Sequence, residues 1–333
     1  MIQNVYNRLL RTTTVVDFPN KKSEHGTGFF YNYNGSTFLI TNRHVLEHEE
    51  NQPEKVSIYF RDYSSIENIN RIDITLYEDH FPRWLIHPDF PEADLTALPL
   101  NQNLSHVNDS DHKTGSLALS AETFADPDLL IRGGTGARVF GYPQGYVDKN
   151  SKFPIARSGL IASPYGYWFD DSPQFLLDGS MGDGMSGSPV FTDRTTEFER
   201  LDGNSHMAGS TTFFIGVHAA EYRTPANPQD TDSNINHIWY SELIESLLSI
   251  NGLCDFVDSV SFERDSDFLD NGLDIDYLSE FVTKTTTWEM FDPECNKPDS
   301  PSEAVNNTIE PDTILELVSN LEESATSVTK EEN

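Results

Sequence analysis

The sequence predicts an all-β fold class, and three observations indicate it. Short runs rich in β-branched and aromatic residues recur along the first 240 residues, and Gly, Pro, Asn and Asp separate them. Helical spacing interrupts this pattern only near residue 240 within the first 251 residues. A single β domain often uses roughly 200–250 residues, and this chain has 333. The expected strands are Thr37–Thr41, Lys55–Phe60, Arg71–Tyr77, Arg83–Ile86, Arg138–Gly141, Ile155–Ile161, Phe175–Leu177, Pro189–Phe191 and Thr211–Val217.

The segment Ile238–Ile250 is expected to form a helix that closes the β domain. Its apolar residues recur at helical spacing, at Leu243, Ile244, Leu247 and Leu248. We therefore expect one domain over residues 1–251 and a separate extension over residues 252–333.

The extension is strongly acidic. It holds 21 Asp and Glu against 4 Lys and Arg, about half of the chain's net charge of −32. Such a composition favours a partly helical or disordered acidic extension. Two apolar stretches leave open a docking arm for a regulatory protein partner or for the chain's own first domain. They are Leu273, Ile275, Tyr277, Leu278, Phe281 and Val282, and Ile314, Leu315, Leu317, Val318 and Leu321.

The overall charge excludes one class of partner. A net charge of −32 argues against nucleic acid, because phosphates need a basic surface. No apolar run reaches the roughly 18 residues that would cross a membrane. The first residues lack a basic and then apolar signal segment, and Cys254 and Cys295 are the only cysteines. We therefore expect a cytoplasmic protein with no membrane partner.

The segment Gly182–Val190 has the pattern of a serine nucleophile on a glycine-rich turn. Ser186 lies between Gly184 and Gly187, and the strand pattern at Pro189 follows at once. Glycines allow backbone conformations that a Cβ would forbid. Successive N–H groups can then point to one spot beside the serine hydroxyl and stabilise an oxyanion.

A base and an acid lie upstream of this serine. His44 follows the apolar strand pattern Thr37–Thr41, and Asp94 begins another apolar run. A serine hydroxyl needs a base such as imidazole to take its proton, and a carboxylate fixes the imidazole tautomer. The chain order His, Asp, Ser differs from the Ser, acid, His order of α/β-hydrolases.

Four motifs together resemble the trypsin-like serine peptidases of chymotrypsin fold, in the cysteine-poor bacterial and archaeal branch that includes the glutamyl endopeptidases. They are Gly26-Thr27-Gly28-Phe29, Thr41-Asn42-Arg43-His44-Val45, Ala93-Asp94-Leu95-Thr96-Ala97-Leu98 and Gly184-Met185-Ser186-Gly187-Ser188-Pro189. Thr96 is one extra residue in the third motif. Phe214–Ala219 is similar to the late barrel strand that lines the specificity pocket of the family.

The resemblance implies two six-stranded antiparallel barrels, a closing helix and a serine endopeptidase that needs no cofactor or metal. The expected catalytic residues are His44, Asp94 and Ser186, which would cleave a polypeptide substrate through an acyl-enzyme. The Gly184 and Ser186 amides would form the oxyanion hole. Met185 stands where animal trypsins carry an activating Asp.

The expected substrate-binding residues are Ser180, Met181, His218 and Ala219. Ser180 falls at the pocket base, where trypsins carry Asp, so a basic P1 residue is not favoured. His218 lies where glutamyl endopeptidases place a pocket histidine, which suggests an acidic or polar P1 residue. Met181 and Asp183 argue against that preference, and a histidine packed between strands is the alternative.

Two other interpretations stay open at this point, whereas a third, a calcium loop, is less favoured than an ordinary acidic loop. His44-Val45-Leu46-Glu47-His48 also fits a zinc-peptidase pattern, although that reading leaves Asp94 and Ser186 unexplained. The residues Asp265, Asp267, Asp270, Asn271 and Gly272 suggest a calcium loop but fail the EF-hand spacing. The fold could also serve as a binding or regulatory module that is catalytically latent or activated by a partner.

Overall fold

The computed structural model describes residues 8–19, 21–47, 53–62, 68–78, 81–100, 104–107, 115–222 and 234–249. All of them belong to the first of two compact units, residues 1–258, and the second unit covers 259–333. The expectations for the acidic extension, its two cysteines and the Asp265–Gly272 loop lie outside the described residues. The domain boundary at residue 251 stays a prediction.

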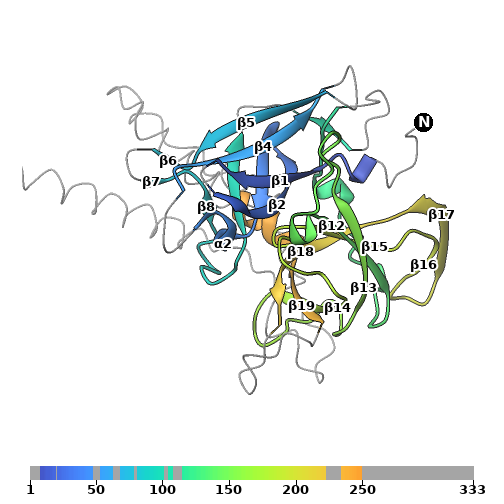
Figure 1. The fold of residues 1–333 in the computed structure, drawn as a ribbon. Coiled ribbons are helices and arrows are strands. Elements are labelled where there is room, and N and C mark those ends of the chain that lie inside the picture. The colour runs from blue at the N-terminus through green and yellow to red at the C-terminus, as the bar shows by residue number, and fades with distance from the viewer. Residues whose placement is uncertain are drawn as a thin grey trace, which may run out of the picture. The chain divides into compact units, whose positions relative to one another are not determined.

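The N-terminal half forms a seven-stranded antiparallel sheet with the strand order β5-β4-β1-β2-β3-β9-β8 (Figure 1). Its two end strands, β5 and β8, do not pair in the described part of the chain. A closed six-stranded barrel was predicted for this half, but its described residues form an open, half-barrel sheet. The strands are β1 (Thr13–Phe18), β2 (Lys21–Tyr33), β3 (Ser36–Thr41), β4 (Lys55–Arg61), β5 (Ile69–Thr75), β8 (Leu85–Ile86) and β9 (Thr96–Leu100).

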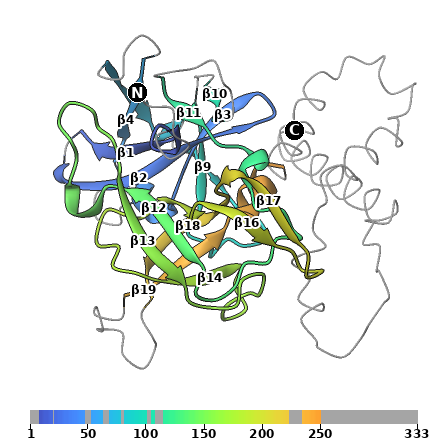
Figure 2. The same ribbon diagram turned by 90° about the vertical axis from the view of Figure 1, so that its right-hand side faces the viewer.

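The C-terminal half forms a closed six-stranded barrel, as predicted, and it lies beside the first sheet (Figure 2). Together they make the expected chymotrypsin-like architecture. In the order of their pairing, the barrel strands are β12 (Gly136–Gly141), β13 (Ile155–Ile161), β14 (Gln174–Asp178), β19 (Ile235–Tyr240), β18 (Phe214–Glu221) and β15 (Pro189–Thr192).

Short elements connect these sheets. Three two-stranded pairs are β6 (Tyr77–Glu78) with β7 (Phe81–Pro82), β10 (Ser105–His106) with β11 (Leu117–Ala118), and β16 (Thr195–Glu199) with β17 (Ser205–Thr211). The short helices are α2 (Arg43–Leu46), η1 (Ala121–Thr123) and η2 (Pro143–Gly145).

The tight hairpin between β2 and β3 follows from two residues. Asn34 and Gly35 both have positive φ, at 47° and 81°, between the paired residues Tyr33 and Ser36. This conformation matches the twist of the flanking strands, and Asn-Gly favours it. The hairpin fixes the register of β3, which leads directly to His44.

One hydrophobic core joins the two halves. It includes Phe29 of β2 and Phe214 of β18, whose rings meet edge to face with centroids 5.3 Å apart. The predicted helical residues Leu243, Ile244, Leu247 and Leu248 are buried in the same core.

The closing helix occupies residues 242–249 of the described chain. The predicted start at residue 238 was wrong, because Ile238 belongs to β19 and pairs with Phe175 and His218. The helix and the shared core hold the two sheets in a fixed relation, so side chains from both can form one site.

Candidate active site

His44 and Asp94 are brought together by neighbouring strands. Thr41, at the end of β3, pairs with Thr96, at the start of β9, so the turns beyond these residues lie side by side. Asn42 is buried at the start of α2, and its side-chain amide donates a 2.5 Å hydrogen bond to the Asp94 carbonyl oxygen. This bond fixes the backbone that carries the carboxylate.

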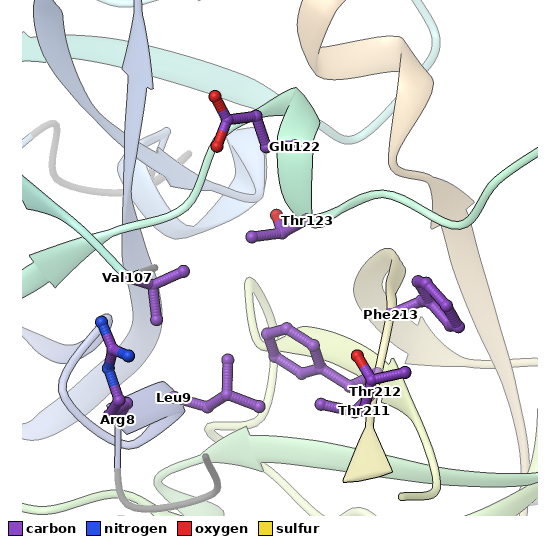
Figure 3. A pocket seen from close by; sticks show the side chains of 9 residues that line it. Arg8, Leu9, Val107, Glu122, Thr123, Thr211, Thr212 and Phe213 are labelled. Carbon is purple, nitrogen blue, oxygen red and sulfur yellow. The ribbon is translucent and has the colours of Figure 1, made fainter. Parts of the chain in front are cut away.

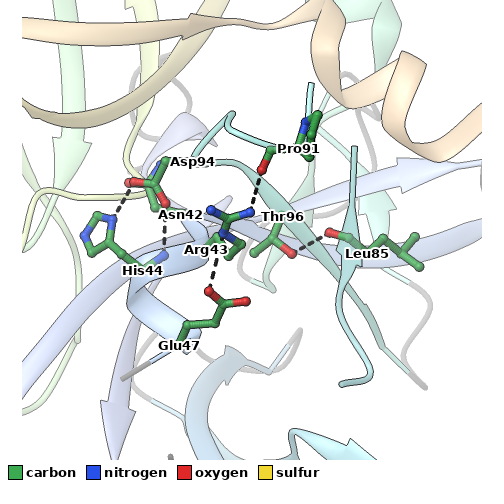
Figure 4. Close-up of polar contacts among 8 residues, drawn as sticks. All are labelled: Asn42, Arg43, His44, Glu47, Leu85, Pro91, Asp94 and Thr96. Atoms are coloured by element: carbon green, nitrogen blue, oxygen red, sulfur yellow. Dashed lines mark hydrogen bonds and ion pairs between the residues drawn. The ribbon is translucent and has the colours of Figure 1, made fainter. Parts of the chain in front are cut away.

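The Asp94 carboxylate contacts His44 at two points (Figure 4). The His44 backbone N–H donates to Oδ1 at 2.9 Å, and the ring Nδ1 lies 2.5 Å from Oδ2. A carboxylate can only accept, so Nδ1 carries the proton and, in the neutral ring, Nε2 is left as an acceptor. His44 keeps half of its side chain exposed, against 26% for Asp94, so the base remains reachable by substrate.

The charge of Asp94 is stabilised where it lies. Burial by itself would raise the pKa of Asp94. The hydrogen bonds from the His44 ring and backbone N–H, together with the nearby charges of His44 and Arg43, outweigh burial and lower the pKa. The carboxylate is therefore ionised at neutral pH and can hold an imidazolium.

The Ser186 turn depends on three glycines with positive φ. Gly182, Gly184 and Gly187 have φ values of 79°, 85° and 83°. A Cβ on Gly184 would lie 2.6 Å from the Tyr142 carbonyl oxygen, and one on Gly187 would collide with the Thr27 carbonyl oxygen. Only glycine fits at these two positions.

One candidate oxyanion donor is directed by its neighbour's carbonyl. The Asp183 carbonyl oxygen accepts a 2.6 Å hydrogen bond from the Gln144 backbone N–H. In a trans peptide the N–H points opposite to the C=O. The anchored Asp183 carbonyl therefore fixes the direction of the Gly184 N–H.

The second candidate donor is directed in the same way. The Met185 carbonyl oxygen accepts from the Ser188 backbone N–H at 3.0 Å and lies 3.1 Å from the His218 ring Nδ1. This carbonyl fixes the direction of the Ser186 N–H. Within the described residues, no hydrogen bond uses the amide of Gly184 or Ser186, so both can bind an incoming oxygen.

The Ser186 turn and the His44 turn are in contact across the two sheets. A Cβ on Gly187 would overlap the Thr41 hydroxyl, and Thr41 precedes His44 by three residues. The Thr27 N–H of β2 donates to the Ser186 carbonyl oxygen at 2.9 Å. No hydrogen bond joins the Ser186 hydroxyl to the His44 ring in the part of the chain that the structure describes.

The comparison with protein families decides the identity. Residues 26–198 match the family described as the trypsin-like peptidase domain. The chain belongs to this family. The family that the motifs predicted is thus confirmed. No curated protein matches the chain.

Several solved structures are similar to this peptidase. One is the HtrA-type protease AlgW with a tripeptide, at 16% identity and a TM-score of 0.43. The match covers 76% of the present chain and 63% of the AlgW chain. Another is the serine endoprotease from Yersinia pestis, at 13% identity and a TM-score of 0.41, and that match covers 74% of the present chain and 66% of the Yersinia chain. The chain spans less than two thirds of the length of these proteases.

The predicted pocket residues of the peptidase lie on two segments. Ser180 is exposed and Met181 is buried, and both follow β14. His218 and Ala219 are buried on β18, 3% and 4% exposed. The pocket assignment of these four residues stays a prediction.

His218 is bonded inside the C-terminal barrel. Its ring Nε2 lies 3.0 Å from Asn236 Oδ1, and its Nδ1 faces the Met185 carbonyl. Burial lowers the pKa of His218 to about 4 and outweighs the two acceptor oxygens, which favour the protonated ring. The ring is therefore neutral near pH 7, and its single N–H can donate to only one of these two oxygens at a time.

Sequence reasoning missed three residues that position the site: Thr27, Gln144 and Asn236. Thr27 lies within the Gly26–Phe29 motif, whose pattern could have pointed to it. Gln144 adopts positive φ, at 50°, which no sequence pattern indicates. Asn236 donates to three backbone carbonyls and so turns its oxygen to His218. A buried asparagine of this kind is recognised only from its surroundings.

Within the described part of the chain, the candidate site holds no metal-binding group and is separate from a cavity on another part of the domain. Among the described residues, no group of His, Cys, Asp and Glu side chains could hold a metal ion, and His48 of the zinc pattern lies outside them. No described helix is long and apolar enough to span a membrane.

A cavity of about 160 Å³ lies away from the candidate active site (Figure 3). It is lined by Arg8, Leu9, Val107, Glu122, Thr123, Phe191, Thr211, Thr212 and Phe213.

Proposed function

We propose that the protein is a serine endopeptidase with His44, Asp94 and Ser186 as its catalytic triad. Ser186 Oγ attacks the scissile carbonyl carbon while His44 Nε2 takes the hydroxyl proton. The C–N bond then breaks, and His44 gives the proton to the leaving amine. Water, activated by His44 in the same way, hydrolyses the acyl-enzyme.

The two-point contact of Asp94 with His44 carries this proposal. Oδ1 holds the backbone N–H and Oδ2 faces Nδ1, so the ring cannot turn without losing a bond. This arrangement keeps Nε2 unprotonated, as a base requires. A histidine that only packed in a protein would not need an ionised carboxylate at this position.

The oxyanion hole would consist of the Gly184 and Ser186 N–H groups. Their directions follow from the anchored carbonyls of Asp183 and Met185. Donors that are held in place before the reaction stabilise the developing charge at no cost in reorganisation. One such donor contributes a factor of about 10²–10³ to kcat.

Cleavage of an internally quenched peptide with both ends blocked tests the proposal, because only an endopeptidase can cut it. The full-length chain should cleave it, and Ser186→Ala should lower kcat by several orders of magnitude. Ser188→Ala is the matched control, because within the described part of the chain its buried hydroxyl makes only one weak hydrogen bond, to Met185 Sδ at 3.9 Å. Equal loss in both variants, or full activity of Ser186→Ala, would refute the assignment of Ser186.

A second candidate is a latent peptidase-fold module that binds a partner. The observation that favours it is the lack of a hydrogen bond between Ser186 and His44 in the described residues. Catalytic hydrogen bonds are often long without substrate, so this observation alone does not decide. A fluorophosphonate probe separates the two: labelling of Ser186 in the full chain supports the enzyme, and no labelling supports the module.

The regulatory partner and the compartment are also proposals. A partner that binds the acidic extension would change the rate at which the probe labels Ser186. We propose a cytoplasmic location on the sequence composition alone, and fractionation of the source cells tests it.

We further propose a preference for an acidic or polar P1 residue. Arg157 Nη1 donates to the Ser180 carbonyl oxygen at 3.2 Å, so a cation lies beside the predicted pocket base. Asp183 is exposed nearby in sequence and Met181 is apolar, which limits the preference. A cleavage profile over a peptide library tests it, and a clear hydrophobic P1 preference would contradict it.

A further inference from the structure

We infer that the Thr27 hydroxyl is a positioning residue that holds the oxyanion loop, residues 182–188, against the neighbouring loop, residues 142–146. This inference rests on the proposed peptidase function. Thr27 lies on β2 of the N-terminal sheet, whereas both loops belong to the C-terminal half. It would thus couple the two halves of the enzyme at the site of reaction.

The Thr27 hydroxyl makes two hydrogen bonds, one to each loop. Oγ1 donates to the Gly184 carbonyl oxygen at 2.8 Å and accepts from the Tyr142 backbone N–H at 3.1 Å. Thr27 is fully buried, so water does not substitute for either bond. A carbonyl only accepts and an amide only donates, and therefore both directions are fixed.

The Thr27 backbone reinforces these contacts. Its N–H donates to the Ser186 carbonyl oxygen at 2.9 Å, and its carbonyl accepts from the Thr41 hydroxyl at 2.7 Å. Thr41 ends the strand that leads to His44. Thr27 therefore touches both the nucleophile loop and the strand that leads to the base.

Both hydrogen bonds of the hydroxyl act on the Gly184 N–H. The Tyr142 amide leads into η2, whose Gln144 N–H anchors the Asp183 carbonyl and so directs the Gly184 N–H. The bond to the Gly184 carbonyl holds the next peptide. Without the hydroxyl, the Gly184 carbonyl and the buried Tyr142 N–H would both lose this partner, and such groups seek new partners by rotating.

Rotation is available at this point of the loop. Gly184 has no Cβ and already has φ of 85°, so its two peptides can turn at little steric cost. A turned peptide moves the Gly184 N–H away from the oxyanion. Substrate binding elsewhere along the cleft would be unaffected, so the defect should appear in kcat rather than in KM.

Three variants of the full-length chain test this inference. Thr27→Val keeps the shape and removes the hydroxyl, whereas Thr27→Ser keeps the hydroxyl. Thr37→Val is the matched control, because the Thr37 hydroxyl is equally buried and also donates once, to Asn32 Oδ1 at 2.7 Å, and accepts once, from the Leu104 N–H at 3.2 Å. Each valine variant loses one donated and one accepted hydrogen bond, but only Thr27→Val loses them at the oxyanion loop.

Kinetics with the quenched peptide give the first readout. We expect Thr27→Val to lower kcat about 10- to 100-fold, with KM within about 3-fold of wild type. This decrease is smaller than the one that follows from the complete loss of an oxyanion donor, because the Gly184 N–H is displaced only part of the time. Thr27→Ser should restore kcat, and Thr37→Val should leave it unchanged. An unchanged kcat in Thr27→Val, or an equal loss in Thr37→Val, would overturn the inference.

Hydrogen exchange gives a second readout that does not depend on catalysis. The backbone amides of Tyr142 and Gln144 should exchange faster in Thr27→Val than in Thr27→Ser or Thr37→Val. If the wild type proves inactive, the proposed function fails, and the exchange comparison alone decides the role of Thr27. Equal exchange in all three variants would contradict that role.

Discussion

The substitution Asp94→Asn tests the tautomer argument for His44. It exchanges one of the two acceptor oxygens around His44 for an NH₂ group. The His44 backbone N–H can bond only to an oxygen, and it lies 2.9 Å from Oδ1. The oxygen of the introduced amide therefore stays on this backbone N–H, and the NH₂ group faces the ring Nδ1. The ring must then carry its proton on Nε2, where it cannot accept the proton of Ser186.

The expected decrease in kcat is large, because His44 in the wrong tautomer cannot act as the base. In the chymotrypsin type of triad the same exchange lowers kcat by about 10⁴. A factor of this size equals about 5.5 kcal/mol of transition-state stabilisation. We expect a similar loss here, with a fold that is intact by circular dichroism.

The assay is kcat for the quenched peptide, measured near neutral pH. Asp73→Asn is the control, because Asp73 also accepts two hydrogen bonds, from the Ser57 and Arg71 side chains, but lies on β5 away from the site. The control should keep wild-type kcat. A loss of less than about 10-fold in Asp94→Asn, against the ~10⁴ expected, would refute the tautomer argument. An equal loss in Asp73→Asn would also refute it.

Three further predictions concern stability and the turn. Gly187→Ala should lower the free energy of unfolding, measured in urea, by at least about 2 kcal/mol and remove most of the activity. The reason is that a Cβ at its φ of 83° meets the Thr27 carbonyl oxygen. A stable and active variant would contradict this prediction. His218 has its pKa lowered to about 4, so the folded state resists its protonation, and stability should fall by about 3 kcal/mol as pH drops from about 6.5 to about 4. The His218→Gln variant should lose less folding stability than wild type over this pH range. An equal loss in both proteins would contradict a lowered pKa of His218. Burial raises the pKa of Glu242, so wild-type stability should fall as pH rises from the unfolded pKa of about 4.3 through the folded pKa. The Tm of Glu242→Gln should therefore rise relative to the Tm of wild type between pH 4 and 7. A difference in Tm that does not change with pH would refute this prediction.

The strands were predictable where side-chain pattern decided the structure. Ile155–Ile161 matches β13 residue for residue. The segment Thr211–Val217 was predicted as one strand, but β17 ends at Thr211 and β18 begins at Phe214. Thr212 and Phe213 leave the ladder because they bond to Thr192 of β15. Contacts of this kind depend on the tertiary fold and leave no periodic trace in the sequence.

The candidate site was predictable to a different degree. His44, Asp94 and Ser186 stand in motifs, and the structure brings the first two into hydrogen bonding. Thr27 stands in the Gly26–Phe29 motif, but the motif does not show that its hydroxyl bonds to backbone atoms of the other half. Gln144 acts through its backbone N–H, so no property of its side chain could reveal its role.

Acylation by p-nitrophenyl acetate tests the central claim most directly. The account predicts that acid-quenched wild-type protein carries an acetyl group on Ser186, found by peptide mass mapping. His44→Ala should carry none on the same time scale, because the serine then has no base. The absence of acetyl on Ser186 in the wild type, or equal acetylation in His44→Ala, would contradict the account.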